Sequence, residues 1–214
     1  MNTKRILFWL GFLVVLGLII WGLVVAANKP SAKSTLGAPA PVTAADHTIG
    51  AANPKVTLIE YGDFECPACA QFATVVEKLI DTSSTTLQVV FRHFPLPQHL
   101  NAPIAAQASE AAAAQGKFWD MYRLIYAGQN DWANLSEADA QKTFAGYALQ
   151  LGLNVPKFNA DIGSTTAKSF IQSELEEGQA LGVNYTPSFF VDGKLVENPQ
   201  SYEAFKAIID AAAR

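Results

Sequence analysis

Residues 55–69 read KVTLIEYGDFECPAC, and this stretch decides the fold. Its first half, Lys55–Tyr61, is rich in β-branched and aromatic residues and ends at Gly62-Asp63, which predicts a strand that stops at a turn. Cys66 and Cys69 follow. Beyond them, apolar residues recur at the spacing of one helix face, at Phe72, Val75, Val76, Leu79 and Ile80. The sequence therefore predicts a strand, a cysteine pair at the turn, and a helix that begins with that pair.

The rest of the chain supplies further strands and a block of helices. Leu87–Phe94 is a second long strand, stopped by prolines, and a short strand around His47–Ile49 precedes the first. Two short strands, Ser188–Val191 and Leu195–Val196, flank a hairpin turn. Caps and apolar spacing predict helices over 101–115, over 117–127, from Ser136 to Leu151, from Pro156 to Leu181 and from Tyr202 to Ala212. The order is βαβ, helices, then ββα, and without the helical block it is the order of a thioredoxin fold.

The N-terminal segment is apolar enough to span a membrane. Ile6–Ala27 is a run of 22 residues without a charge, and about 20 apolar residues cross a bilayer core. Lys4 and Arg5 precede the run, which places the rest of the chain outside the cytoplasm. We expect a transmembrane anchor over residues 1–27; the alternative is a signal peptide cleaved after Ala27. Residues 28–45, rich in Pro, Ala, Ser and Thr, are expected to form a flexible linker.

The net charge and the placement of the cysteines limit the classes of function that the chain can have. The chain has 15 Lys and Arg against 19 Asp and Glu. Lys4 and Arg5 precede the membrane segment, so 13 basic residues face 19 acidic ones beyond it, a net charge of −6. That balance argues against a nucleic-acid partner, which favours a basic surface. Both cysteines of the chain lie in one C-x-x-C motif, whereas structural disulfides are normally spread through a sequence. The pair therefore indicates chemistry.

A C-x-x-C pair on the first turn of a helix suits thiol–disulfide exchange. The helix N-terminus presents unpaired N–H groups and the positive end of its dipole, and both stabilise a thiolate at Cys66. Cys69, one turn later and more shielded, is placed to resolve a mixed disulfide. Pro67 suits the first helical position.

Zinc is the competing use of such a pair. His93 and His99 could complete a Cys2His2 set. However, 23 residues separate Cys69 from His93, more than in a zinc finger, and Pro95 and Pro97 interrupt any helix that holds both histidines. Two inert buried cysteines are a further alternative. We expect no metal and no organic cofactor, because the dithiol itself carries the electrons.

Four segments together resemble the DsbA-like thiol–disulfide oxidoreductases: TLIEYGDFECPAC, FRHFPL, AAQGKFWDMYRLIYAGQ and GVNYTPSFFVDGK. The resemblance extends from Asp46 to Ala213, with the segments in the family's order. It implies an α/β, thioredoxin-like fold with an inserted all-helical domain, here preceded by the N-terminal transmembrane helix. On this division, residues 46–99 and 184–214 form the thioredoxin-like core and residues 100–183 form the helical insertion.

The resemblance also implies roles by position. Cys66 corresponds to the nucleophile, Cys69 to the resolving cysteine, and Pro187 to a cis-proline that faces the pair. The backbone of Thr186 is then free to pair with an extended substrate peptide. Glu60 matches a buried acidic residue that exchanges protons with Cys69 in some members. An exposed glutamate at a strand end is the alternative for Glu60.

Further residues are expected around the dithiol. Phe64 and Tyr185 would give its rim an apolar surface for unfolded substrates, with core packing as the alternative for each. Pro67 and Ala68, between the cysteines, complete the expected substrate contacts. Strong oxidants of the family have a histidine where this chain has Ala68, which argues against a strongly oxidising disulfide.

The implied function is that of an enzyme that passes disulfides to unfolded or partly folded exported polypeptides and is reoxidised by a disulfide-generating membrane partner. The same site could run in reverse, as a reductase or isomerase supplied with electrons from the cytoplasm. A thioredoxin-fold binding or chaperone module with incidental cysteines is the third alternative. In each case the N-terminal segment places the folded domain outside the cytoplasm, at the cell surface or in a periplasm.

Overall fold

The structure, a computed structural model, describes residues 9, 12–13, 17, 21 and 37–214. Its contacts divide the chain into two units, Met1–Thr35 and Leu36–Arg214, and the cysteine pair belongs to the second. The expected transmembrane segment falls largely outside the described residues, as do residues 28–36 of the expected linker. Within the described part of the chain, no helix is both long enough and apolar enough to cross a bilayer. The anchor stays a prediction.

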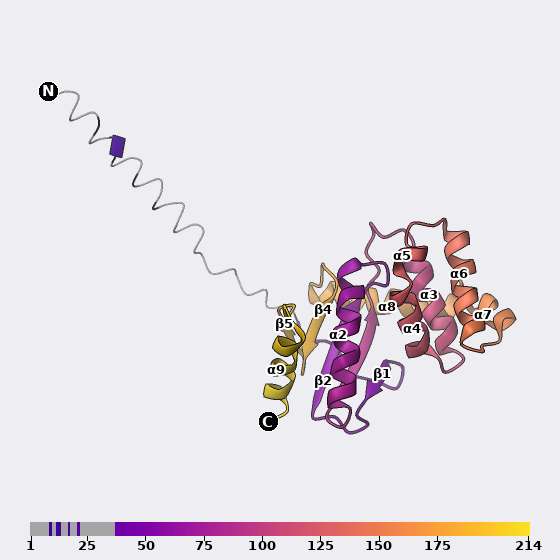
Figure 1. Cartoon of the computed structure of the whole chain (residues 1–214), viewed down its shortest axis with the longest axis horizontal. Helices are drawn as coiled ribbons and strands as arrows, with labels where there is room; N and C mark the ends of the chain where they lie inside the picture. Colours follow the sequence, from indigo (N-terminus) through magenta and orange to yellow (C-terminus); the bar gives the residue numbers. More distant parts are fainter. Residues whose placement is uncertain (1–8, 10–11, 14–16, 18–20, 22–36) are drawn as a thin grey trace. The chain divides into compact units, whose positions relative to one another are not determined.

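A mixed sheet forms the centre of the second unit, with the strand order β1-β3-β2-β4-β5 (Figure 1). The strands are β1 (His47–Gly50), β2 (Val56–Gly62), β3 (Leu87–His93), β4 (Ser188–Val191) and β5 (Lys194–Val196). β2 and β3 are parallel neighbours joined through α2 (Pro67–Ser83), while β1 and β4 pair antiparallel with β3 and β2. β5 forms a hairpin with β4. The predicted strands and the strand–cysteine–helix order are confirmed.

Helices cover both faces of the sheet. On one face, α2 and α9 (Tyr202–Ala212) bury Leu79 and Phe205 against Leu58 of β2. On the other face, the last helix before β4 packs Leu175 against Tyr61 of β2. Because side chains alternate along a strand, Glu60 lies on the same face as Leu58, the face that α2 covers.

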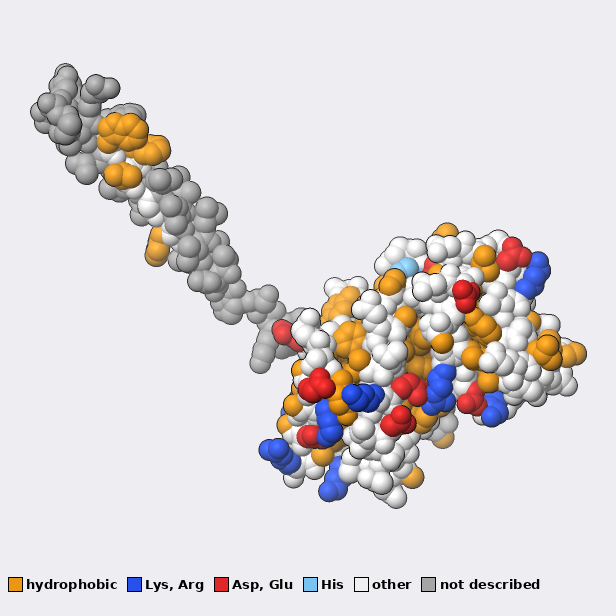
Figure 2. All heavy atoms as spheres, viewed as in Figure 1, with side chains coloured by type: hydrophobic (Ala, Val, Ile, Leu, Met, Phe, Trp, Pro, Cys, Tyr) orange, Lys and Arg blue, Asp and Glu red, His pale blue; other side chains and the backbone are white. Residues whose placement is uncertain are grey.

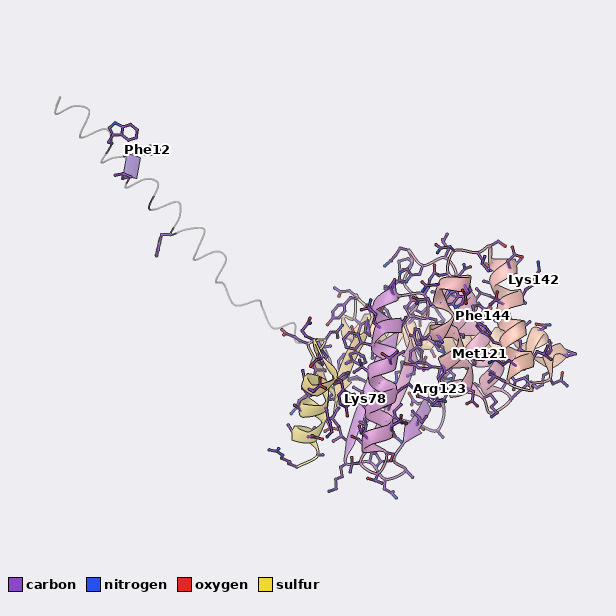
Figure 3. The ribbon with its side chains drawn as sticks, in the orientation of Figure 1. Phe12, Lys78, Met121, Arg123, Lys142 and Phe144 are labelled. Atoms are coloured by element: carbon purple, nitrogen blue, oxygen red, sulfur yellow. The ribbon has the colours of Figure 1, made fainter. Side chains whose placement is uncertain are left out.

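Most of the helical block lies beside the sheet, to the right in Figure 1. It consists of α3 (Ala102–Ala113), α4 (Phe118–Ala127), α5 (Gln129–Trp132), α6 (Glu137–Gln150), α7 (Val155–Asp161) and α8 (Thr165–Leu181). Its own core is fully buried and includes Met121, Trp132 and Phe144, two of which Figure 3 labels. The expected helical insertion is present, and its last helix, α8, also covers the second face of the sheet. Sheet and helices accordingly belong to one compact unit.

One expected helix is two helices. The run from Pro156 to Leu181 breaks between α7 and α8, because Gly163 adopts a left-handed conformation (φ +77°) that a helix does not allow. Ser164 then caps α8, with its side chain accepting a hydrogen bond from the Ala167 N–H at 3.2 Å. The four-residue α5 was not predicted either.

Residues 37–45, expected as part of a flexible linker, are fixed against the domain. The Ala40 N–H donates to Glu177 Oε1 of α8 at 2.7 Å, and the Ala40 carbonyl accepts from Arg92 Nη2 at 3.1 Å. The hydrogen-bond requirements of Arg92 explain why this segment is held against the domain. Arg92 is buried in β3, and a buried guanidinium needs partners, which it finds in Asp46, Glu177 and this carbonyl.

Charges of both signs intermingle on the face shown in Figure 2, over α9, α2 and α4. Several are paired, as Arg123 is with Glu77 at 3.0 Å and Lys206 with Asp210 at 2.7 Å. The described residues of this face therefore present mixed charge to the solvent.

Candidate active site

Cys66 lies where the chain leaves the β2 turn and enters α2. It is the N-cap of this helix, with extended backbone angles (φ −70°, ψ 120°), and Pro67 occupies the first turn as predicted. The N–H groups of a first turn have no partner inside the helix, so they are available to a sulfur at the cap. Both cysteines are free thiols, so the structure shows the dithiol form.

The surroundings of Cys66 favour its thiolate. The Cys69 thiol, hydrogen-bonded to the Cys66 sulfur, has the largest effect, and burial opposes it. The Thr186 side chain and the backbone N–H groups of Ala68 and Cys69 also lower this pKa. Together they lower the pKa of Cys66 to about 5. At neutral pH this thiol is ionised, which is the state in which a cysteine is a nucleophile.

The pKa of Cys69 is shifted in the opposite direction, although both cysteines are buried, with 7% of Cys66 and none of Cys69 exposed. Cys69 lies on the inner side of the first turn and is completely buried. Burial raises the pKa of Cys69 well above its ordinary value, and the neighbouring Cys66 and Glu60 raise it further. Cys69 therefore keeps its proton while Cys66 loses its own.

Glu60 lies in the interior beneath the dithiol. Only 1% of its surface is exposed, and its Oε1 atom has no hydrogen-bond partner among the described residues. Burial raises the pKa of Glu60 to about 8, with a smaller contribution from the negative charge of Cys66. Of the two alternatives for this residue, the buried carboxyl is correct. At neutral pH it is mostly protonated.

Thr186 and Pro187 lie across from Cys66. The peptide bond between them is cis, as expected. In its protonated form the Cys66 thiol donates a hydrogen bond to the Thr186 carbonyl at 3.4 Å. Asn198 donates to the Pro187 carbonyl at 2.9 Å. Tyr185 is 42% exposed, so it offers an aromatic surface next to this segment.

The family relation rests on most of the chain. The thioredoxin family profile matches residues 42–211. The chain belongs to the thioredoxin family. Its fold is that of the DsbA-like thiol–disulfide oxidoreductases within this family, because it keeps both the thioredoxin core and the inserted helices.

Among the known relatives are much longer proteins, and only a part of each resembles this chain. The Na(+)/H(+) antiporter NhaA 1 of Salinispora arenicola is 36% identical over 168 residues, which cover 78% of this chain and 24% of the antiporter. The chain thus spans about a quarter of the length of the curated relatives it matches.

Solved structures show the same fold at low identity. The thiol-disulfide exchange protein α-DsbA2 of Wolbachia pipientis has a TM-score of 0.68 at 17% identity, covering 78% of this chain and 87% of that one. Oxidised BdbD of Bacillus subtilis has a TM-score of 0.69 at 20% identity, covering 84% and 97%.

Phe64 does not form part of the site's surface. Only 1% of it is exposed, and its ring packs on Phe91, Tyr122 and Tyr126 at centroid distances of 5.1, 5.9 and 4.9 Å. The expectation of a substrate-contacting Phe64 is therefore corrected: α4 covers this ring. Pro67 and Ala68 are exposed, as a substrate contact requires.

Several residues that hold the thioredoxin-fold site were not singled out from the sequence. Gln129 of α5 donates from Nε2 to the carbonyls of Phe64 and Cys66, at 2.7 and 3.1 Å. Asp63 is buried and accepts from the N–H groups of Glu65 and Leu96 at 2.7 and 2.8 Å. The helical insertion thus fixes the loop that positions Cys66. Asp63 and Gln129 lie inside two of the four segments that carry the family resemblance.

The two histidines weighed as zinc ligands lie in different places. His99 Nδ1 is 2.7 Å from Asp63 Oδ2, beside the loop that leads to Cys66. His93 Nε2 is 2.8 Å from Glu110 Oε1, at the junction of β3 and α3.

Proposed function

We propose that this chain is a disulfide-donating oxidase that acts outside the cytoplasm on unfolded or partly folded exported polypeptides. The observation that supports this most is the contrast between its two thiols: the pKa of Cys66 is lowered to about 5, and that of Cys69 is raised well above normal. A thiolate stabilised only in the dithiol form favours that form, and so makes the disulfide oxidising.

The proposed reaction begins with the Cys66–Cys69 disulfide. A substrate thiolate attacks the Cys66 sulfur, the bond between the cysteines breaks, and Cys69 leaves with the electron pair. Because the Cys69 thiolate is strongly disfavoured, it takes a proton, and Glu60 is the nearby acid that is still protonated at neutral pH. A second substrate thiolate then attacks the substrate sulfur and releases Cys66 as its stable thiolate. The substrate loses two electrons, and the Cys66–Cys69 disulfide gains them as it becomes the dithiol.

The segment opposite the dithiol supports a polypeptide substrate. Thr186 presents backbone groups next to Cys66, and an extended peptide can pair with such a segment as an added strand. Tyr185 and the exposed Pro67 and Ala68 supply apolar contacts around it. Electrons then leave to a disulfide-generating membrane partner. Residues 6–27 are proposed to anchor the chain in that membrane, with the cell surface or a periplasm as its location.

The second candidate is a reductase or isomerase with the same site. Ala68 favours it, because a histidine at this position would add support to the thiolate and alanine adds only its backbone N–H. We therefore expect an oxidant of intermediate strength, with a potential between about −270 mV for thioredoxin and about −120 mV for the strongest oxidants.

The test is the equilibrium potential of the Cys66–Cys69 couple in glutathione buffers, combined with oxidative refolding of a reduced, unfolded substrate. We expect a potential inside the range above and catalysed refolding that Cys66→Ser abolishes. A potential at or below that of thioredoxin contradicts the oxidase and supports the reductase. Refolding assistance that survives Cys66→Ser contradicts both and supports a chaperone.

A further inference from the structure

Two histidines and a glutamate meet away from the dithiol. His47 comes from β1, His93 from the end of β3, and Glu110 from α3. One ligand atom from each lies within 4.8 Å of the others, the geometry of a group that can hold a metal ion. Both histidines direct Nε2 at the same oxygen, Glu110 Oε1, at distances of 2.5 and 2.8 Å.

We propose that His47, His93 and Glu110 form a binding site for a divalent zinc-type ion, which clamps the first strand and the sheet to the helical insertion. Imidazole nitrogens and a carboxylate oxygen are ligands that zinc and its first-row neighbours prefer. Three protein ligands leave a further coordination position for water, as in many zinc sites.

The side chains are arranged for this role. His93 is 1% exposed, and His47 and Glu110 are 14% and 12% exposed, so the group is shielded yet reachable. The His47 ring is stacked on Phe118 at 3.7 Å and 8°, which fixes the direction of its nitrogens. Glu110 also lines a pocket of about 420 Å³ beside Asp161 and Ser164, which gives an ion a way in.

The local charge also favours a cation. Glu174 of α8 is 6% exposed and accepts the His93 backbone N–H at 2.6 Å. A second, largely buried carboxyl group thus lies beside His93, one of the proposed ligands. Buried carboxylates are stabilised by a nearby positive charge, and a divalent ion between the histidines supplies it.

A bound ion requires a small rearrangement. With bonds of about 2.0–2.1 Å, tetrahedral ligand atoms stand roughly 3.3 Å apart, so Glu110 Oε1 must draw back by about half an ångström or more. The carboxylate lies at the edge of the pocket and has room to do so. Without an ion, the same atoms form a hydrogen-bonded cluster, which is the alternative that the experiment must exclude.

The experiment uses the full chain, free of any histidine tag, with Cys66→Ser and Cys69→Ser so that no thiolate can bind metal. After treatment with EDTA, Zn²⁺ is titrated by calorimetry and Co²⁺ by its visible absorption. We expect a single saturable equivalent and a rise in the unfolding midpoint of about 5–10 °C at a hundredfold excess over Kd. The Co²⁺ spectrum should indicate nitrogen and oxygen ligands.

Variants identify the ligands. His47→Gln and Glu110→Gln should each weaken Zn²⁺ binding at least tenfold, while His99→Gln, the matched control outside the cluster, should leave it unchanged. The proposal is overturned if the parent shows no saturable binding, or if binding survives both ligand substitutions or falls equally with His99→Gln. Should a ligand variant fail to fold in EDTA, the parent decides: no saturable Co²⁺ absorption, or none with nitrogen ligation, overturns the site.

Discussion

The rim and the floor of the dithiol site shift the pKa of a thiol in opposite directions. The rim consists of the first turn of α2 and Thr186, and there hydrogen bonds lower the pKa of Cys66 to about 5. The floor consists of Cys69 and Glu60, both enclosed by packed side chains, and there burial raises both pKa values. Three positions along one helix separate the two thiols.

This difference shows that the site separates the two parts of disulfide exchange, the transfer of electrons and the transfer of a proton. The rim makes a sulfur that attacks and leaves easily, because a low-pKa thiol is a good leaving group. The floor holds a thiol and a carboxyl that keep their protons at neutral pH, so a proton is present where the reaction needs one. Electron transfer takes place at the rim, and proton transfer takes place at the floor.

The largest expected effect of this contrast is on reactivity. At pH 7 nearly all of Cys66 and almost none of Cys69 is thiolate, so alkylation of the reduced protein should modify Cys66 more than about 100 times faster. Iodoacetamide labelling followed by mass spectrometry across pH 3–9 should give a midpoint near pH 5 for Cys66. In urea, where the fold is absent, the two rates should converge. Faster labelling of Cys69 in the folded protein would reverse the assigned roles.

The next effect concerns the floor and the free energy of unfolding. The pKa of Glu60 is raised from 4.5 to about 8, so the folded chain holds a proton that the unfolded chain loses. Its contribution to stability is complete below pH 4.5 and is lost as the pH rises to about 8. Glu60→Gln cannot ionise, and should be more stable than the parent by a few kcal/mol at pH 8–9 and about equal at pH 4.

Denaturant unfolding at the two pH values measures this difference. Glu197→Gln, at an exposed glutamate, is the matched control. Its difference from the parent in unfolding free energy should be the same at both pH values. If the difference in unfolding free energy between Glu60→Gln and the parent is the same at pH 8–9 as at pH 4, burial does not disfavour the charged form of Glu60. The floor then does not differ from the rim in the way described.

Local patterns were enough to predict the elements that form this site. The β-branched run before Gly62, the cysteine pair and the helical spacing after it gave a strand, a turn and a helix, which the structure confirms. The break at Gly163 was missed, although the adjoining glycine and serine are a recognisable stop and cap. The apolar stripe of Phe170, Ile171 and Leu175 lies wholly after the break, so its spacing does not show where the helix begins.

Contacts distant in sequence could not be predicted in this way. Phe64 precedes the cysteines in a loop, and whether its ring is exposed depends on α4, which follows more than 50 residues later. Gln129 lies 63 and 65 residues from the two carbonyls it holds. The burial of Glu60 likewise depends on how α2 folds back over its face of the sheet. Periodicity fixes which face a side chain takes, but packing decides what lies on that face.

The smallest expected effect tests how the rim is held. Gln129 Nε2 donates to the carbonyls of Phe64 and Cys66, and Gln129 is largely buried. Gln129→Met keeps the volume of the side chain and removes both hydrogen bonds, which leaves two carbonyls of a buried loop without this donor. We expect a loss of about 1–3 kcal/mol in unfolding free energy. We also expect slower alkylation of Cys66, because the loop that places its sulfur at the end of α2 is no longer fixed.

Gln150→Met, at the exposed end of α6, is the matched control and should change neither value. If Gln129→Met behaves like this control, the insertion does not hold the loop, and the low pKa of Cys66 depends on α2 and Thr186 alone.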